Sequence, residues 1–256
     1  MKVLTRITVA ACAALALLPA PSSGQVAPIT DADRAAAFPD VEGHVVHDAV
    51  NYFVLFDQLE WQGGDGRAGA SWDMKGWIGG DRDRFWFRTE GDARQTRLAS
   101  TQTHFLYGRA IARWWDLVVG VRQDVRPGPA QTWAAVGIQG IAPYWFDVQA
   151  TAYVGASGRT HLRFESEYDL LLTNRLVLQP LVEAEIYGKS DPDHGFGAGL
   201  STVDVGLRLR YEIRREFAPY VGLVWSRTFF GTAEVAEAAG ERSEGARLAL
   251  GARLWF

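Results

Sequence analysis

Long segments in which apolar and polar residues alternate at every second position constrain the fold of this chain more than any other feature. In the clearest of them, Leu162 and Phe164 alternate with Arg163 and Glu165. Successive side chains of a β-strand point to opposite faces, so this alternation gives a strand with one apolar and one charged face. No helical periodicity returns after residue 50, and we predict an all-β fold. The expected strands, about twelve in number, are 51–61, 69–80, 83–91, 97–108, 113–124, 131–141, 144–154, 160–172, 175–187, 199–212, 217–228 and 245–256.

The lengths of these segments and of their connections distinguish a membrane barrel from a soluble β-sandwich, which also has one apolar and one polar face. The segments exceed the roughly five or six residues of ordinary strands and match the roughly 9 to 11 that cross a bilayer at a tilt. Tight connections such as 80–82 and 173–174 alternate with longer ones such as 189–198 and 228–244. This pattern predicts an antiparallel up-and-down transmembrane β-barrel with its short turns and both ends on the periplasmic side.

Aromatic residues near the strand ends are expected to form the interfacial girdles of such a barrel. They are Trp114, Trp115, Tyr144, Trp145, Tyr187, Tyr211, Tyr220, Trp255 and Phe256. The last expected strand alternates apolar residues up to Phe256, which resembles the assembly signal of bacterial outer-membrane barrels. Outer-membrane lipid and the barrel assembly machinery are therefore expected partners. A formal net charge of -4 provides no electrostatic footprint for nucleic acid.

The N-terminal region has the pattern of an exported protein. Lys2 and Arg6 precede an apolar run over residues 7–18, which is shorter than the roughly 20 residues of a spanning helix. We interpret residues 1–24 as a secretory signal peptide, residues 25–50 as a periplasmic N-terminal segment and residues 51–256 as the barrel. Within the second segment, Thr30 is an N-cap candidate and Pro39 a stop, which predicts one short helix between them.

Strand parity places a large set of charged residues on the face opposite the apolar one. If the apolar faces contact lipid, this set lines the lumen as a charge network of Arg163, Glu165, Glu167, Asp169, Glu183, Glu185, Asp204, Arg208, Arg210 and Glu212. Two interpretations are compatible with it. The charges could pair with one another and fill a narrow barrel, since buried charges must be paired. They could also form a pore or holding site in which acidic residues attract cations.

Metal-ligating residues are sparse, with five His and two Met in the whole chain. His44 and His47 are three residues apart, a spacing that brings both imidazoles to one side of a helix or turn near the periplasmic mouth. The alternative is a solvated pair in a flexible tether. His104 and His161 face the lumen by strand parity, and His194 falls in an outer loop. The four candidate metal ligands are therefore His44, His47, His104 and His161, with a copper ion as the candidate ligand.

The sequence does not favour an enzyme. It contains no Gly-x-Ser-x-Gly elbow, no P-loop and no His-Glu-x-x-His motif. A lipid-hydrolysing barrel would need a Ser–His pair on one face. His161 and Ser166 are five residues apart on one expected strand and therefore face opposite sides.

Several stretches of the sequence are distinctive. The most specific are LLTNRL at 171–176 and LRLRYEIRREFAPY at 207–220, together with TDADRAAAFPD at 30–40, and others lie at 56–61, 76–81, 114–117, 120–124, 142–146 and 179–180. Through these stretches, from residue 30 to residue 256, the chain resembles the copper resistance protein B family of the Gram-negative outer membrane.

The resemblance implies a barrel involved in copper tolerance that binds copper or mediates its export from the periplasm, with a periplasmic multicopper oxidase as an expected partner. Members often carry a His- and Met-rich segment before the helix, whereas residues 21–29 contain neither residue type. Soft thioether and imidazole ligands capture copper, so high-capacity sequestration is not expected here. The alternative function is a general small-solute or ion channel, or a structural barrel without copper selectivity.

Overall fold

A computed structural model describes residues 28–37, 49–64, 68–94, 97–240 and 242–256. Residues 28–37 and the barrel belong to separate units and are described separately. The expected signal peptide, His44 and His47 lie outside the described residues. In the parts of the chain just given, no helix is long and apolar enough to cross a membrane.

The short N-terminal helix predicted from Thr30 and Pro39 is present as α2 (Asp31–Ala37). Thr30 caps it as predicted, because its Oγ1 accepts a hydrogen bond from the Asp33 backbone N–H at 3.2 Å. In return, the Thr30 hydroxyl and backbone N–H donate to the Asp33 carboxylate at 2.6 and 2.8 Å. These hydrogen bonds lower the pKa of the exposed Asp33 carboxyl.

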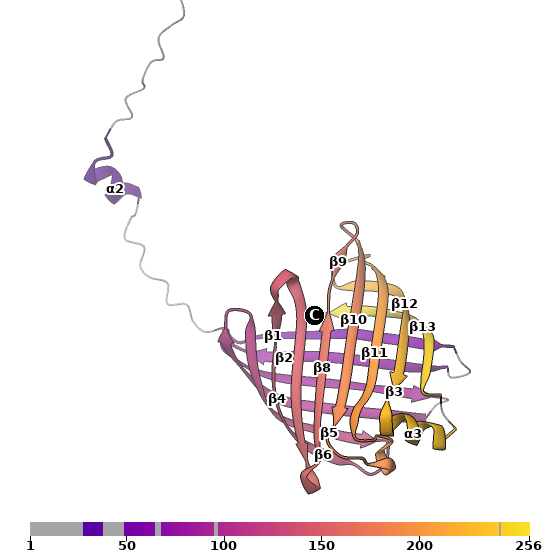
Figure 1. Cartoon of the computed structure of the whole chain (residues 1–256). Helices are drawn as coiled ribbons and strands as arrows, with labels where there is room; N and C mark the ends of the chain where they lie inside the picture. Colours follow the sequence, from indigo (N-terminus) through magenta and orange to yellow (C-terminus); the bar gives the residue numbers. More distant parts are fainter. Residues whose placement is uncertain (1–27, 38–48, 65–67, 95–96, 241) are drawn as a thin grey trace, which may run out of the picture. The chain divides into compact units, whose positions relative to one another are not determined.

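The described residues of the second unit form a closed antiparallel barrel of twelve strand positions (Figure 1). Except at β8 and β9, each strand pairs with its neighbours in the sequence, and β13 pairs with β1, so the sheet closes on itself as the up-and-down pattern predicted. The strands are β1 (Asn51–Gly63), β2 (Gly69–Gly79), β3 (Asp83–Arg94), β4 (Arg97–Ala112), β5 (Trp115–Arg126), β6 (Gln131–Ala142), β7 (Phe146–Gly155), β8 (Thr160–Glu167), β9 (Leu170–Leu171), β10 (Leu176–Tyr187), β11 (Gly199–Tyr211), β12 (Phe217–Thr228) and β13 (Glu244–Trp255).

Two strands depart from regular pairing. The expected strand 160–172 is interrupted between β8 and β9, which both pair with β10 and together occupy one position of the barrel. In β1 the register shifts after Phe56 against both neighbours, at Asp57. Asp57 is also the residue at which the sequence interrupts the apolar alternation of the strand, and the bulge accommodates this interruption.

The two rims of the barrel carry connections of different kinds. One rim holds the start of β1, the end of β13 and the tight turns, including 80–82 and the 3₁₀ turn η2 (Pro143–Trp145); we call it the turn rim. The other holds the 3₁₀ turns η3 (Ala156–Gly158) and η4 (Pro192–His194) and the helix α3 (Phe230–Ala238); we call it the loop rim. In outer-membrane barrels short turns face the periplasm, which places the loop rim outside.

Strand parity separates the two faces of the wall. Along β6, exposed and buried residues alternate at nearly every position, with Val136 and Ile138 outside and Trp133 and Ala135 inside. At the turn rim, Trp114 and Trp145 are exposed with ring centroids 6.0 Å apart, in agreement with an interfacial girdle.

The girdle prediction is wrong for Tyr187 and Tyr220, which are buried in the lumen. In β10 and β12 these two residues occupy positions whose side chains point into the lumen. The Tyr220 hydroxyl donates a hydrogen bond to Glu60 at 2.9 Å. Proximity to a strand end therefore did not distinguish these two rings from girdle residues.

Candidate functional site

A column of stacked rings occupies one side of the lumen. His161 of β8 lies between Tyr153 and Tyr187, with ring centroids 5.0 and 4.2 Å away, and Phe196 stacks on Tyr187 at 3.8 Å. Arg122 donates to His161 Nδ1 at 3.0 Å, and His161 Nε2 lies 3.5 Å from a Glu185 oxygen. Both ring nitrogens of His161 therefore already face a charged neighbour.

His104 of β4 reaches the same column. Its Nε2 and the Tyr153 hydroxyl are hydrogen-bonded at 3.1 Å, and the side chain is 3% exposed. Its Nδ1 has no hydrogen-bond partner. The two lumen histidines predicted from parity are thus brought together around Tyr153, and His104 keeps one ring nitrogen free.

Arg163 of β8 connects opposite sides of the barrel at mid-lumen. Its guanidinium contacts Glu90 of β3, with one Nη2–Oε2 distance of 2.6 Å, and Glu183 of β10 at 2.7 Å. A Glu165 oxygen lies 3.5 Å away. One guanidinium therefore binds three carboxylates, and its bridge to Glu90 spans strands that lie almost opposite each other in the strand order.

A second set of ion pairs joins other strands across the lumen. Lys75 of β2 pairs across the barrel with Glu167 of β8 at 3.5 Å, and these two strands are opposite each other in the sheet. Arg208 and Arg210 of β11 bind Glu60 and Asp169 at 3.1 and 2.7 Å. Arg253 pairs with Asp57 at 2.6 Å and also lies 3.7 Å from an Asp169 oxygen. The lumen charges pair with one another here, as the first of the two sequence-based interpretations expected.

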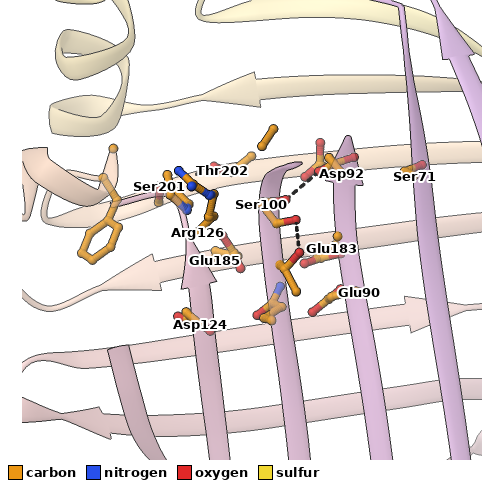
Figure 2. A pocket seen from close by; sticks show the side chains of 18 of the residues that line it. Ser71, Glu90, Asp92, Ser100, Asp124, Arg126, Glu183, Glu185, Ser201 and Thr202 are labelled. Carbon is orange, nitrogen blue, oxygen red and sulfur yellow. Dashed lines mark hydrogen bonds between the residues drawn. The ribbon is translucent and has the colours of Figure 1, made fainter. Parts of the chain in front are cut away.

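The loop-rim half of the lumen contains a cavity of about 720 Å³; we call it the outer cavity. Figure 2 shows Glu90, Asp92, Asp124, Glu183 and Glu185 around it. Among the described lining residues, carboxylates outnumber guanidinium groups by nine to six. With all of these groups in their ionised forms, the outer cavity carries a net negative charge, which attracts cations.

The loop 188–198 and helix α3 cover part of the outer cavity. The hydroxyl of Thr232 in α3 accepts a hydrogen bond from the Gly197 backbone N–H at 2.9 Å, and it lies at the same distance from the Ser201 hydroxyl. A Cβ at Gly197 would stand 2.2 Å from the carbonyl carbon of Gly231, so the loop and the helix are in direct backbone contact. We call this pair of segments the lid.

Asp191 anchors the lid to two neighbouring loops. Its carboxylate contacts Arg159, Gln131 donates to it at 3.3 Å, and His194 Nδ1 lies 2.9 Å away. His194 Nε2 also lies 3.0 Å from the Pro129 carbonyl oxygen. Burial raises the pKa of the Asp191 carboxyl, but the contacts with His194 and Arg159 outweigh it, and the net pKa is lowered.

Most of the predicted charge network lies in the lumen. Glu212 is the exception, because it follows the end of β11 and pairs with Arg215 at 2.7 Å in the turn 212–216. Parity reasoning extended one residue too far, past the end of the strand.

Sequence reasoning missed several lumen residues. Asp73, Lys75, Glu90 and Arg88 line the lumen from β2 and β3, where the apolar alternation is weaker. The same parity rule, applied to these two strands, could have found them. Among the described residues, no group of three or more His, Cys, Asp or Glu side chains is arranged to hold a metal ion.

The barrel and its charged lumen agree with the comparison to known sequences. The family model of Copper resistance protein B precursor (CopB) matches residues 50–256. The chain belongs to this family. It is 49% identical to Copper resistance protein B of Escherichia coli over 232 residues, covering 90% of this chain and 78% of that protein. It is also 49% identical to the Copper resistance protein B homolog of Pseudomonas syringae pv. tomato over 239 residues, covering 93% and 81% of the two chains.

A solved structure supports the fold alone. The NanC porin superposes with a TM-score of 0.52 at 10% sequence identity, covering 80% of this chain and all of the porin. Family membership and the closed barrel together place this copper resistance protein B family member in the outer membrane.

Proposed function

We propose that this barrel acts in copper tolerance by holding copper ions in its outer cavity, or by passing them outward from the periplasm. The observation that carries the proposal is the excess of carboxylates over guanidinium groups around a cavity of about 720 Å³. A cation that enters this space exchanges part of its hydration shell for carboxylate oxygens in a region of negative potential.

The candidate copper ligands in this proposal are His104 and His161 with the lumen carboxylates, and His44 and His47 near the periplasmic mouth. His104 supports a copper site in the lumen because one of its ring nitrogens has no hydrogen-bond partner. Outer-membrane lipid, the barrel assembly machinery and a periplasmic multicopper oxidase remain the proposed partners. The proposed role is non-enzymatic.

A copper titration and a tolerance assay test this function. We expect the refolded mature barrel to bind copper and cells that lack the protein to grow less well at elevated copper. Copper binding lost in a His44→Ala/His47→Ala variant would place the site at the periplasmic mouth, and retained binding would place it in the lumen. No binding together with unchanged tolerance would overturn the proposal.

One observation favours the alternative function. The Lys75–Glu167 and Arg163–Glu90 pairs cross the lumen and narrow it, as in a structural barrel or a restricted channel. Planar-bilayer conductance with equal permeability to copper and to other small cations would support this alternative. Conductance that copper blocks or saturates would support copper handling.

A further inference from the structure

Helix α3 borders the outer cavity on the loop rim but is not packed into the protein core (Figure 1). Val235 and Ala236 of the helix, and Ala239 directly after it, line the cavity. Of the nine residues of α3 only Thr232 is buried, so the helix buries no apolar side chain. Segments that bury little apolar surface open at a low free-energy cost. The packing therefore allows α3 to leave the cavity while the barrel stays folded.

The chain on both sides of the helix is held by the strand ladder. The Phe229 backbone N–H donates to the Ser201 carbonyl oxygen at 2.8 Å, and the Thr228 N–H donates to the Ser243 carbonyl oxygen at 2.8 Å. These two hydrogen bonds fix the points at which the chain leaves the barrel wall and returns to it. Any movement of α3 must therefore take place between them.

Two residues with a left-handed backbone lie at the ends of the helix. Phe230, its first residue, has a φ of 46°, and Gly240 has a φ of 72°. Glycine adopts this conformation freely, whereas it strains a residue with a side chain, and the 68% exposed Phe230 gains little packing in return. Residues at the ends of an element commonly absorb the backbone change of a hinge. Phe230 and Gly240 have the positions of two hinges, and the strain at Phe230 favours movement.

A single side chain fastens the helix in its present position. The Thr232 hydroxyl accepts a hydrogen bond from the Gly197 backbone N–H at 2.9 Å and donates one to the Ser201 hydroxyl oxygen at 2.9 Å. The neighbouring loop has its own anchor in the wall, because Phe196 stacks on Tyr187 at 3.8 Å. The loop can therefore keep its place when α3 moves, and the Thr232 hydroxyl is the latch between them.

The side chains of α3 indicate what the helix does over the cavity. Val235 and Ala236 line it, whereas the carboxylates of Glu234 and Glu237 are exposed to solvent. The helix thus covers a space bordered by carboxylates with apolar side chains and adds no charged group to it. Such a cover restricts the access of charged solutes and does not bind them.

We propose that α3 is a flap that opens and closes the outer cavity to solutes, turning about Phe230 and Gly240 and held shut by the Thr232 hydroxyl. The structure shows the closed position. This inference goes beyond the proposed function, because it concerns access to the cavity whichever cation the cavity holds.

The test measures how fast a reagent reaches a cysteine inside the cavity. Val224→Cys is the reporter, since Val224 lines the outer cavity and is 7% exposed, and the one native cysteine, Cys12, falls in the expected signal peptide. The mature barrel is refolded in detergent and treated with a maleimide that carries a bulky dye. In the reporter background, Thr232→Val should raise the reaction rate about tenfold, because the closed position then leaves the buried Gly197 N–H without its acceptor.

A second variant should act in the opposite direction. Asparagine tolerates the left-handed backbone better than phenylalanine, so Phe230→Asn relieves the strain of the closed position. We expect it to lower the reaction rate by a factor of about two to ten. Thr173→Val is the matched control, because Thr173 Oγ1 accepts hydrogen bonds from two backbone N–H groups in a turn of the opposite rim; it should leave the rate unchanged.

Native-state hydrogen exchange of the unmodified barrel needs no reporter and no variant. The Gly197 N–H is protected by the latch and should exchange faster than the paired amides of β11. Exchange as slow as that of β11 would overturn the inference. So would equal maleimide rates in Thr232→Val, Phe230→Asn and the reporter alone, or acceleration by both variants. Neither measurement involves copper, so these outcomes leave the proposed function standing.

Discussion

Removing Arg163 should destabilise the barrel more than any other single loss of charge in the lumen. The side chains of Arg163, Glu90, Glu165 and Glu183 are each between 11 and 21% exposed, so this cluster is a buried ion-pair network. Breaking such a network from one side costs roughly 3–5 kcal/mol, because the remaining charges stay buried without a partner. Arg163→Gln leaves three carboxylates in this state, and we expect a loss in that range.

The partner variant Glu90→Gln distinguishes this mechanism from a general loss of packing. Arg163 then keeps Glu183 and Glu165, and the glutamine oxygen can still accept one of the two hydrogen bonds that Glu90 accepts, so the expected loss is about 1.5–3 kcal/mol, that of one charge-assisted hydrogen bond. Urea unfolding of the barrel in lipid vesicles, followed by tryptophan fluorescence, measures both changes. Arg227→Gln is the control, since Arg227 is 49% exposed and 3.8 Å from Glu244; it should change stability by less than about 0.5 kcal/mol.

The reasoning fails if Arg163→Gln stays within about 1 kcal/mol of the unmodified barrel. It also fails if Glu90→Gln costs as much as Arg163→Gln, because the structure predicts a clear difference between them.

Two further predictions concern the lid. Gly197→Ala places a methyl group 2.2 Å from Gly231, so the loop and α3 must separate by more than 1 Å to reach the roughly 3.5 Å of an ordinary carbon–carbon contact. A cysteine introduced in the outer cavity should then react faster with a thiol probe from solution. Gly240→Asn is the control and should leave this reaction unchanged, because no atom lies within 4 Å of a Cβ at Gly240. Because the pKa of Asp191 is lowered, its carboxylate stabilises the lid fully above pH about 4, the pKa of an unfolded carboxyl, and this stabilisation is lost as the pH falls through the folded pKa. The hydrogen-exchange protection of the loop, corrected for the intrinsic exchange rate, should therefore fall below about pH 4. An Asp191→Asn variant with the same pH dependence would contradict this assignment.

Strand pattern and topology followed from the sequence because every strand contacts lipid on one face and the lumen on the other. This environment imposes alternation on each strand independently of the rest of the fold. The break in that alternation at Asp57 coincides with the bulge of β1, where its carboxylate reaches Arg253. The tight connections that alternate with longer ones indicated the order of the strands and the up-and-down barrel.

The pairing of charges across the lumen could not be predicted in the same way. Parity shows that Lys75 and Glu167 point inward, but their contact depends on the strand number and stagger of the closed barrel. Helix α3 was also missed, because residues 228–244 were interpreted as one long loop, although the run AEVAEAA at 233–239 consists largely of good helix formers. Its position depends on the Gly197–Gly231 contact, which joins two segments distant in the sequence.

The two bridges that cross the barrel also determine how fast any ion can travel through it. An ion moving between the rims has to compete with Lys75 for Glu167 and with Arg163 for Glu90, one after the other. Each passage then waits for a side chain to rotate away and return, so transport through this lumen would reach a maximum rate as the ion concentration rises. Such saturable flux would be the behaviour of a carrier and would differ from that of a water-filled porin, in which flux increases in proportion to concentration.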